Sequence, residues 1–358
     1  MALDPGDGRR AAIVGTGLMG GSIGLALRQR GWHVTGRDHD PARAEQARVL
    51  GALDDVGDDP GADITFVATP VGAVLDEVRT ALDGGARLVT DIGSVKTPML
   101  ELMADPRYVG GHPMAGSEQE GLEGARPDLF EGATWVLTPV PGTDDDAFAA
   151  IRGVISSLGA EVVALAPERH DRMVAIVSHV PHLTAASLMG LADERAEEHR
   201  ALLRLAAGGF RDMTRVAAGH PGIWPDICAE NREAIVDELG RLIEALGEVR
   251  DIVATGDRDG LVERLQRART ARRNLPTRVA HPEELSELRV AIPDEPGAAA
   301  RIFLLASELD VSVADFEVVH SAEGPTGVLV LLVESAEGRR LHDALVARGD
   351  RPALRALG

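Results

Sequence analysis

A histidine in a glycine-rich segment is the residue of this chain that is best suited to chemistry. His112 lies in GGHPMAGSE (residues 110–118), where Pro113 and several glycines fix the backbone at the end of a predicted strand. An imidazole exchanges its proton near neutral pH, so a positioned His112 could remove the proton of a substrate hydroxyl. Ser94, in DIGSVK (91–96), could hydrogen-bond the same hydroxyl or the imidazole. The alternatives are a His112 that only satisfies a buried carbonyl and a Ser94 that only caps the next helix.

A second segment has the spacing of a nucleotide-binding turn. AAIVGTGLMGGSIG (11–24) places three glycines as G-x-G-x-x-G between an apolar strand and a predicted helix. Such glycines permit a tight turn and let a pyrophosphate approach the backbone at the helix N-terminus. The alternative is a purely structural glycine turn. The residues expected to contact a cofactor here are Gly15, Gly17, Leu18, Met19 and Gly20.

An acidic residue after the second predicted strand indicates which nucleotide binds. Asp38 follows the glycines by roughly 20 residues, where a carboxylate bonds the adenosine ribose hydroxyls of NAD. Its neighbours Arg37 and His39 could instead hold the 2′-phosphate of NADP, and a solvated loop acid is the remaining alternative. We expect NAD. A cofactor that takes hydride, beside a histidine that takes the hydroxyl proton, would oxidise an alcohol.

Composition narrows the class of protein. The chain has 358 residues, 44% of them hydrophobic, which is enough for two or three domains. It shows no signal peptide and no apolar run long enough to span a bilayer, so we expect a cytoplasmic protein. A net charge of −20 disfavours nucleic acid and anionic membranes as partners. The only lysine, Lys96, lies in the DIGSVK segment beside the expected site.

Metal and disulfide chemistry is not expected. Cys228 is the single cysteine, which rules out an internal disulfide and a Cys-rich metal site. His179 and His182 are three residues apart with Pro181 between them, and no third ligand is evident, so a zinc pair is doubtful.

The order of predicted elements indicates three domains. Residues 1–166 alternate strands with helices, which predicts an α/β domain with a doubly wound parallel sheet. Its expected strands are 11–14, 33–36, 63–69, 87–93, 108–111, 134–139 and 161–165, with an acidic loop at 54–63. Residues 167–284 read as helices only, with long apolar faces typical of a dimer interface. Residues 285–358 read as a small ferredoxin-like β-α-β-β-α unit with room for a final strand.

Several segments together resemble the prephenate dehydrogenase family. They are GTGLMGGSIG, VATPV (67–71), DIGSVK, GGHPMAGSE, SHVPH (178–182) and FRDMTRVAAGHPGIWPDICAEN (210–231), in the family's order. The resemblance implies oxidative decarboxylation of prephenate with NAD, in tyrosine biosynthesis, by a homodimer. It also implies that Thr69 and Pro70 border the cofactor.

The resemblance assigns substrate roles residue by residue. His112 would deprotonate the ring hydroxyl with help from Ser94, and Arg215 would bind a carboxylate. Arg211 would reach the neighbouring subunit's site, and His182 would be a second site histidine. Ser117 and Glu118 would line the same loop as His112.

Two arginines could supply the positive charge that an acidic protein needs in order to bind a dianionic substrate. Arg211 and Arg215 are i, i+4, so both guanidinium groups could point into one pocket from one helical face. Without the resemblance, a solvated basic face is the favoured interpretation. Asp226 and Asn231 are expected to hold the arginine helix.

The C-terminal unit resembles an ACT domain, a fold that binds amino acids. IPDEPGAAARI (292–302) matches the strand-to-helix turn of that family, so Asp294, Pro296 and Gly297 would bind an effector, for which tyrosine is the candidate. Asp310 departs from the pattern, because a glycine is usual before the second strand. A domain that only strengthens the dimer is the alternative.

Three rival functions remain at this point. Arogenate dehydrogenase would pair an acid of the loop, such as Glu118, Glu120 or Glu123, with the substrate ammonium. A sensing protein would bind nucleotide without turnover, against which His112 and Ser94 together argue. A β-hydroxyacid or imine reductase would need a lysine or aspartate on the first helix of the helical domain, where this chain has SHVPHLTAAS.

Overall fold

The computed structural model describes residues 8–100, 102–116, 121–198, 205–273, 285–293, 295–320 and 326–356. The roles expected of Ser117, Glu118, Glu120 and Asp294 therefore fall outside the described residues. The contacts within the chain divide it into two compact units. One comprises residues 1–200 with 213–244, and the other comprises residues 201–212 with 245–358.

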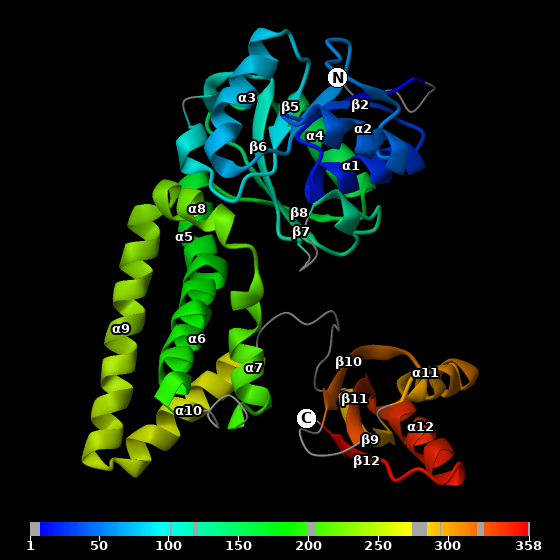
Figure 1. Cartoon of the computed structure of the whole chain (residues 1–358), viewed down its shortest axis with the longest axis vertical. Helices are drawn as coiled ribbons and strands as arrows, with labels where there is room; N and C mark the ends of the chain where they lie inside the picture. The colour runs from blue at the N-terminus through cyan, green and yellow to red at the C-terminus, as the bar shows by residue number, and fades with distance from the viewer. Residues whose placement is uncertain are drawn as a thin grey trace. The chain divides into compact units, whose positions relative to one another are not determined.

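An eight-stranded sheet forms the centre of the N-terminal part, in the order β3-β2-β1-β4-β5-β6-β7-β8 (Figure 1). The expected doubly wound α/β domain is confirmed, with the order reversing between β1 and β4. The strands are β1 (Arg10–Val14), β2 (His33–Arg37), β3 (Asp55–Val56), β4 (Ile64–Val67), β5 (Val89–Asp91), β6 (Tyr108–Pro113), β7 (Thr134–Thr138) and β8 (Glu161–Ala164). The helices between them are α1 (Leu18–Gln29), α2 (Pro41–Leu50), α3 (Val71–Asp83) and α4 (Asp145–Ser157).

Two details of the sheet differ from the sequence-based expectation. β7 runs antiparallel to β6, so the sheet is mixed and not wholly parallel. The alternation of apolar segments gives no direction to a strand, which is why the sequence did not reveal this reversal. The two-residue β3 lies inside the acidic stretch that was expected to be a loop, and pairs with Thr35 and Gly36 of β2.

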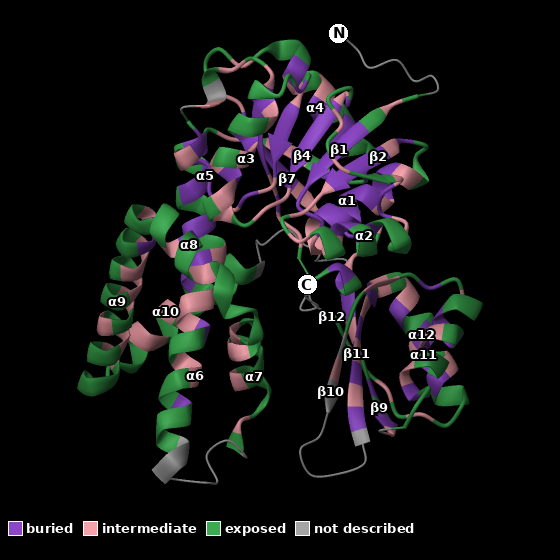
Figure 2. Ribbon diagram, turned by 45° about the horizontal axis from the view of Figure 1, so that its top comes forward, coloured by how far each residue is buried: buried purple, intermediate pink, exposed green. Residues whose placement is uncertain are grey.

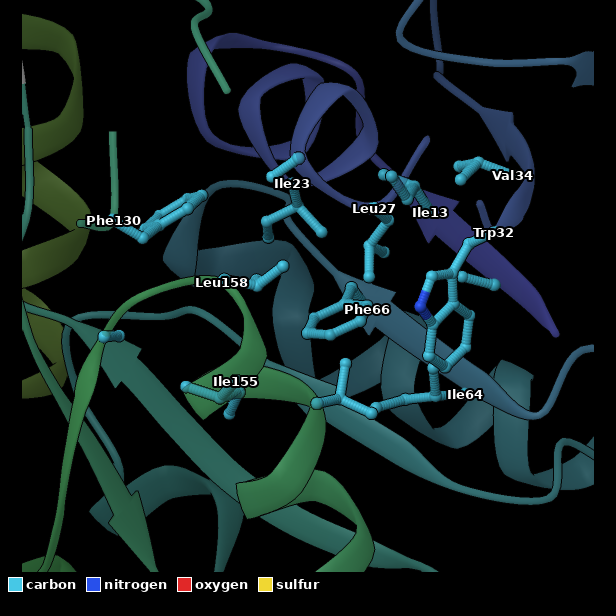
Figure 3. Packing of buried hydrophobic residues seen from close by; sticks show 14 of the residues in the cluster. Ile13, Ile23, Leu27, Trp32, Val34, Ile64, Phe66, Phe130, Ile155 and Leu158 are labelled. Carbon is cyan, nitrogen blue, oxygen red and sulfur yellow. The ribbon is translucent and has the colours of Figure 1, made fainter. Parts of the chain in front are cut away.

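The main core lies where α1 and α4 pack on the sheet, and part of it is drawn in Figure 3. Ile13, Ile64 and Phe66 come from the central strands, while Ile23 and Leu27 come from the inward face of α1. All five are nearly or fully buried. Figure 2 shows the central strands of this sheet and much of α1 as buried. Packing of this kind holds the carboxyl ends of β1, β4, β5 and β6 in fixed positions, and the candidate site lies there.

Helices replace strands after β8, as expected. A continuous helical segment is formed by α5 (Pro167–Val174), the π-helical turn η4 (Ala175–His179) and α6 (Val180–Glu198). Pro181 has no N–H to donate and its ring crowds the preceding turn, which the wider π-helical turn accommodates. There follow α7 (Gly208–Thr214), the 3-10 turns η6 (Arg215–Ala218) and η7 (Pro221–Ile223), α8 (Trp224–Glu230), α9 (Arg232–Thr255) and α10 (Arg258–Arg273).

The segment Pro167–Arg195 is long and apolar enough to cross a membrane by length and composition alone. This corrects the expectation that no run is long enough. Core and interface helices of globular proteins share these properties, and this helix carries the buried polar residues His170, Asp171 and His179. The feature is therefore weak support for a membrane span.

The C-terminal sheet has the strand order β10-β11-β9-β12 with antiparallel neighbours, as in ferredoxin-like folds. Its elements are β9 (Leu285–Pro293), α11 (Ala298–Glu308), β10 (Val313–His320), β11 (Thr326–Glu334), α12 (Ser335–Ala347) and β12 (Ala353–Ala356). Asp310 has a φ of 53°, the left-handed backbone that glycine adopts and aspartate tolerates better than most residues. The position thus keeps the conformation of the usual glycine, and this small domain is consistent with an ACT domain.

Candidate active site

The glycine-rich turn between β1 and α1 is shaped to receive a nucleotide. Gly15 has a φ of 93°, and a Cβ on it would lie 2.6 Å from the carbonyl oxygen of Ala68. A Cβ on Gly20 would lie 1.9 Å from the carbonyl oxygen of Gly15, so α1 packs directly on the turn. A Cβ on Gly17 would meet no atom within 4 Å among the described residues. The open side of the turn is therefore at Gly17, the N-cap residue directly before α1, where a pyrophosphate would approach.

Asp38 lies against this turn. Its carboxylate accepts hydrogen bonds from the Thr16 amide at 2.8 Å and from the Thr16 hydroxyl at 3.2 Å. Burial favours the neutral acid, but the amides of Thr16 and Asp40 and the charge of Arg43 together hold the pKa of Asp38 below its usual value. An ionised Asp38 thus lies directly beside the glycine-rich turn.

Arg37 is held by two carboxylates, which speaks against the alternative in which it binds the 2′-phosphate of NADP. Its guanidinium is paired with Asp58 at 2.7 Å and with Glu77 of α3. Successive residues of a strand point to opposite faces, so Arg37 and Asp38 diverge at the end of β2. The basic side chains near the Asp38 carboxylate are instead those of His39, with Nδ1 at 2.9 Å, and of Arg43, at 3.6 Å.

Thr69 follows β4 on the same edge of the sheet. Its hydroxyl oxygen is buried and has no hydrogen-bond partner among the described residues. Pro70 directly precedes α3. A buried polar atom without a partner costs free energy unless a ligand or water satisfies it, so Thr69 fits a place that a cofactor fills. Together with the open turn at Gly17, this shows that the residues present suit a dinucleotide.

His112 lies inside β6, not in the turn that follows it. It is the antiparallel partner of Val136 in β7, and its side chain is half-buried. Its Nδ1 lies 2.9 Å from Nε2 of His170, whose Nδ1 lies 2.7 Å from a carboxylate oxygen of Asp171. A chain of three side chains thus leads from His112 into α5.

The Asp171 carboxylate also holds the loop after β5. It accepts hydrogen bonds from the backbone amides of Lys96 at 2.8 Å and Thr97 at 2.7 Å. Burial opposes ionisation, yet the hydrogen bonds from His170 and from these amides keep the pKa of Asp171 below its usual value. One carboxylate therefore fixes both the loop that carries Ser94 and the imidazole behind His112.

A buried ion pair lies beneath the same loop. Lys96 and Asp91 are both fully buried and their charged groups are in contact. Asp91 also accepts hydrogen bonds from the Tyr108 hydroxyl at 2.8 Å and from the amides of Gly93 at 2.8 Å and Gly111 at 3.1 Å. Every oxygen of the buried carboxylate is thus satisfied, and β5, the loop and β6 are tied together.

Burial holds the pKa of His112 well below its ordinary value, and positive charge on His170 or on Lys96 acts in the same direction. At neutral pH His112 is therefore a neutral imidazole that can accept a proton. Ser94 lies in the loop between Asp91 and Lys96 and is half-buried.

Two further histidines line α6 and its π-helical turn. His179 is buried, its Nδ1 lies 3.2 Å from the side-chain amide of Asn231, and its Nε2 has no partner among the described residues. Burial lowers the pKa of His179 to about 4. The ring of His182 stacks on Trp224 with 3.7 Å between centroids. Within the described ranges, no group of three side chains could hold a metal ion.

Comparison with known proteins matches both parts of the chain to one family. Residues 23–164 match the nucleotide-binding domain of prephenate dehydrogenase, and residues 166–267 match its dimerization domain. Prephenate dehydrogenase of Bacillus subtilis (strain 168) is 32% identical over 356 residues, covering 94% of this chain and 96% of that protein. The chain belongs to the prephenate dehydrogenase family.

Two solved structures of relatives bear on the site. Prephenate dehydrogenase from A. aeolicus, in complex with hydroxyphenyl propionate and NAD+, aligns with a TM-score of 0.69 at 30% identity, covering 75% of this chain and 98% of that one. Arogenate dehydrogenase from Synechocystis aligns with a TM-score of 0.65 at 29% identity, covering 75% of this chain and 100% of the other.

The two arginines expected to bind substrate do not share a regular helical face. α7 ends at Thr214 and Arg215 begins the 3-10 turn η6, so the i, i+4 spacing does not carry through. Arg211 and Arg215 are both exposed. η6 packs on α6, and a Cβ on Gly219, just after η6, would lie 3.5 Å from the ring of His182. Arg215 thus belongs to a segment that lies beside His182.

Asn231 supports the residues behind His112. Its side-chain amide donates to the carbonyl oxygen of Asp171 at 2.9 Å and lies beside His179. Asp226 lies beside the start of α3, where a Cβ on Gly72 would be 3.2 Å from its carboxylate.

The sequence alone did not predict the residues that hold His112 and Ser94 in place. His170, Asp171, Asp91 and Tyr108 were not singled out, although they form the network behind His112 and Ser94. The adjacent pair His170–Asp171 at the start of a helix is a weak signal, because only the fold brings it to β6. Lys96 was noticed as the only lysine, but its partner Asp91 was not.

Proposed function

We propose that this chain is an NAD-dependent prephenate dehydrogenase that converts prephenate to 4-hydroxyphenylpyruvate. The observation that carries the proposal is the neutral imidazole of His112. It lies at the same edge of the sheet as the glycine-rich turn, and it contacts His170, which in turn contacts Asp171. That arrangement suits removal of a hydroxyl proton beside a hydride acceptor. Family membership narrows the alcohol to the ring hydroxyl of a cyclohexadienyl substrate.

The proposed reaction balances without net release of a proton. The ring carbon that bears the hydroxyl gives up a hydride, for which bound NAD+ is the acceptor, and His112 takes the hydroxyl proton. The resulting dienone loses its ring carboxylate as CO2. The electron pair of the broken carbon–carbon bond enters the ring, which becomes aromatic, and charge collects on the phenolic oxygen. His112 then returns its proton to that oxygen, acting first as base and then as acid.

Other residues are proposed to bind the two ligands. Gly15, Gly17, Leu18, Met19 and Gly20 would hold the pyrophosphate, Asp38 the ribose, and Thr69 with Pro70 the part of NAD near β4. Support comes from the open space at Gly17 and from the unpartnered hydroxyl of Thr69. Arg215 and His182 would bind the substrate with Ser94 beside its hydroxyl, and Arg211 would act in the partner's site.

We also propose a homodimeric cytoplasmic enzyme of three domains, residues 1–166, 167–284 and 285–358. Support for the dimer comes from the family match over residues 166–267 and from large apolar side chains exposed along these helices. They include Val177, Val236, Ile243, Leu246, Val253, Val262 and Leu265, each at least half exposed.

Arogenate is the alternative substrate, because the similar Synechocystis protein is an arogenate dehydrogenase. It differs from prephenate in carrying an ammonium on its side chain. Of the loop acids that could meet this ammonium, Glu123 is described, and it is exposed beside Gly121. We favour prephenate because the Bacillus subtilis relative, 32% identical over 94% of this chain, is a prephenate dehydrogenase.

The test is a steady-state assay of the purified chain with prephenate and with arogenate, each with NAD+ and with NADP+. We expect the highest kcat/KM for prephenate with NAD+. A higher kcat/KM for arogenate would make arogenate the substrate, and a preference for NADP+ would overturn the role proposed for Asp38. Absence of turnover with all four pairs of substrate and cofactor would contradict the proposed activity.

A further inference from the structure

We propose that Asp171 and His170 are positioning residues that set the tautomer of His112. Asp171 keeps a proton on Nδ1 of His170, so Nε2 of His170 accepts a hydrogen bond from Nδ1–H of His112. The proton of neutral His112 then lies on Nδ1, and the lone pair lies on Nε2, the nitrogen left for the substrate. The inference rests on the proposed function, since it concerns how the proposed base is prepared.

The first step concerns the hydrogen bonds that the Asp171 carboxylate makes to described residues. Its two oxygens accept from the amides of Lys96 and Thr97, and Oδ1 also lies 2.7 Å from Nδ1 of His170. An ionised carboxylate can accept hydrogen bonds but cannot donate them. Nδ1 of His170 must therefore carry a proton.

The second step concerns the contact between the two rings. Nε2 of His170 lies 2.9 Å from Nδ1 of His112, so one of these nitrogens donates to the other. If His170 is neutral, its Nε2 is the acceptor and His112 donates from Nδ1. If His170 is an imidazolium, His112 accepts at Nδ1 and carries its proton on Nε2. In the second arrangement His112 has no lone pair left with which to take the hydroxyl proton.

The third step concerns the charge that forms during turnover. When His112 takes the proton it becomes an imidazolium beside a fully buried ring, in a site whose burial disfavours charge. The hydrogen bond to His170 and the negative charge of Asp171 behind it offset this cost without a further proton transfer. A carboxylate that orients an imidazole and stabilises its protonated form acts in the same way in serine hydrolases.

Two variants of His170 separate this role from mere packing. In His170→Gln the side-chain amide can donate to Asp171 while its carbonyl oxygen accepts from His112, so the pattern of donors survives without a titrating ring. In His170→Leu both hydrogen bonds are lost. Asp171 itself is a poorer test, because its loss also frees the loop at Lys96 and Thr97.

The experiment is ¹⁵N NMR of histidine-labelled full-length enzyme at neutral pH without substrate, with the His112→Asn variant used to assign the His112 signals. We expect a protonated Nδ1 and an unprotonated Nε2 on His112 in the wild type and in His170→Gln. In His170→Leu we expect the proton to move to Nε2 and kcat to fall on the order of 10²-fold, with unchanged affinity for NAD+.

A proton on Nε2 of wild-type His112 would overturn the proposal, as would a His170→Leu variant that keeps both the tautomer and kcat. If His170→Leu does not fold, the wild-type and His170→Gln spectra still decide. The spectra require no activity. A chain that turns over neither substrate but shows the expected tautomer would defeat the proposed function and leave this inference standing.

Discussion

Two opposing influences act on the imidazole of His112. Burial favours its neutral form, while the hydrogen-bonded chain to Asp171 stabilises the protonated form that turnover requires. A base whose pKa is low stays unprotonated at neutral pH, and a stabilised conjugate acid lets it accept the proton. The sequence could predict His112, because its glycine-rich surroundings are local. It could not predict Asp171, because the contact joins residues far apart in the chain.

Asp38 should decide the choice of nucleotide. We expect Asp38→Ala to raise the KM for NAD+ and to improve the relative use of NADP+, because the carboxylate would no longer repel a 2′-phosphate and Arg43 lies nearby. Asp38→Asn is the matched control, since it removes the charge but keeps an acceptor for Thr16. The measurement is kcat/KM with both nucleotides. An unchanged ratio in both variants would contradict the ribose role.

Arg215 should act on substrate binding. Losing a charge-assisted contact to a carboxylate costs about 1.5–3 kcal/mol, so Arg215→Ala should raise the KM for prephenate roughly 10- to 100-fold. Arg215→Lys should recover only part, because the planar fork is lost. Arg241→Ala, which removes an exposed arginine paired with Glu238, is the control. A KM that stays at the wild-type value in Arg215→Ala would leave this residue as part of a solvated face.

At the scale of elements, one continuous helical segment positions most of the site's histidines. It consists of α5, η4 and α6 and carries His170, Asp171, His179 and His182. Apolar periodicity predicted these helices and most strands of the sheet. It could not predict the π-helical turn, the direction of β7 or the two-residue β3, which depend on packing and pairing between distant segments. The spacing of Arg211 and Arg215 likewise predicted that they share one face of an α-helix, but the α-helix ends at Thr214 and a 3-10 turn begins at Arg215.

The helix also makes a prediction about stability and pH. His179 has a folded-state pKa of about 4 against an ordinary 6.5, so the unfolded chain binds more protons between these values. Stability therefore rises with pH across this window and is lost as pH falls from 6.5 toward 4. The shift of His179 corresponds to at most about 3.5 kcal/mol of folding free energy.

Denaturant unfolding of wild type and His179→Gln at several pH values measures this contribution. Glutamine can still accept from Asn231 but does not titrate, so the variant should lose less stability than the wild type on acidification. Parallel loss in the two proteins would show that His179 does not titrate as expected.

At the scale of the molecule, an acidic enzyme of net charge −20 must bind an anionic substrate through local cations. The C-terminal domain carries no residue of the candidate site. Its order of elements was predictable from alternating patterns. The left-handed backbone at Asp310 was not, because the residue itself is not glycine.

We predict that tyrosine binds this domain near Pro296 and Gly297 and lowers activity. Allosteric coupling is typically about 1–3 kcal/mol, so substrate affinity should fall several-fold. A chain ending near residue 282 should stay active and lose this sensitivity. Tyrosine titrations on the full and shortened chains provide the test. Equal inhibition of both would place tyrosine in the active site as a product mimic.

The most direct measurement compares turnover of prephenate with NAD+ by the wild type and by His112→Asn, together with the affinity of each for NAD+. We predict that the wild type releases NADH, CO2 and 4-hydroxyphenylpyruvate in equal amounts. The variant should bind NAD+ equally well and lose about 10²- to 10⁴-fold in kcat, as expected when a positioned base is removed. A wild type without turnover, or a variant with the wild-type rate, would contradict the role of His112 as the base of a prephenate dehydrogenase.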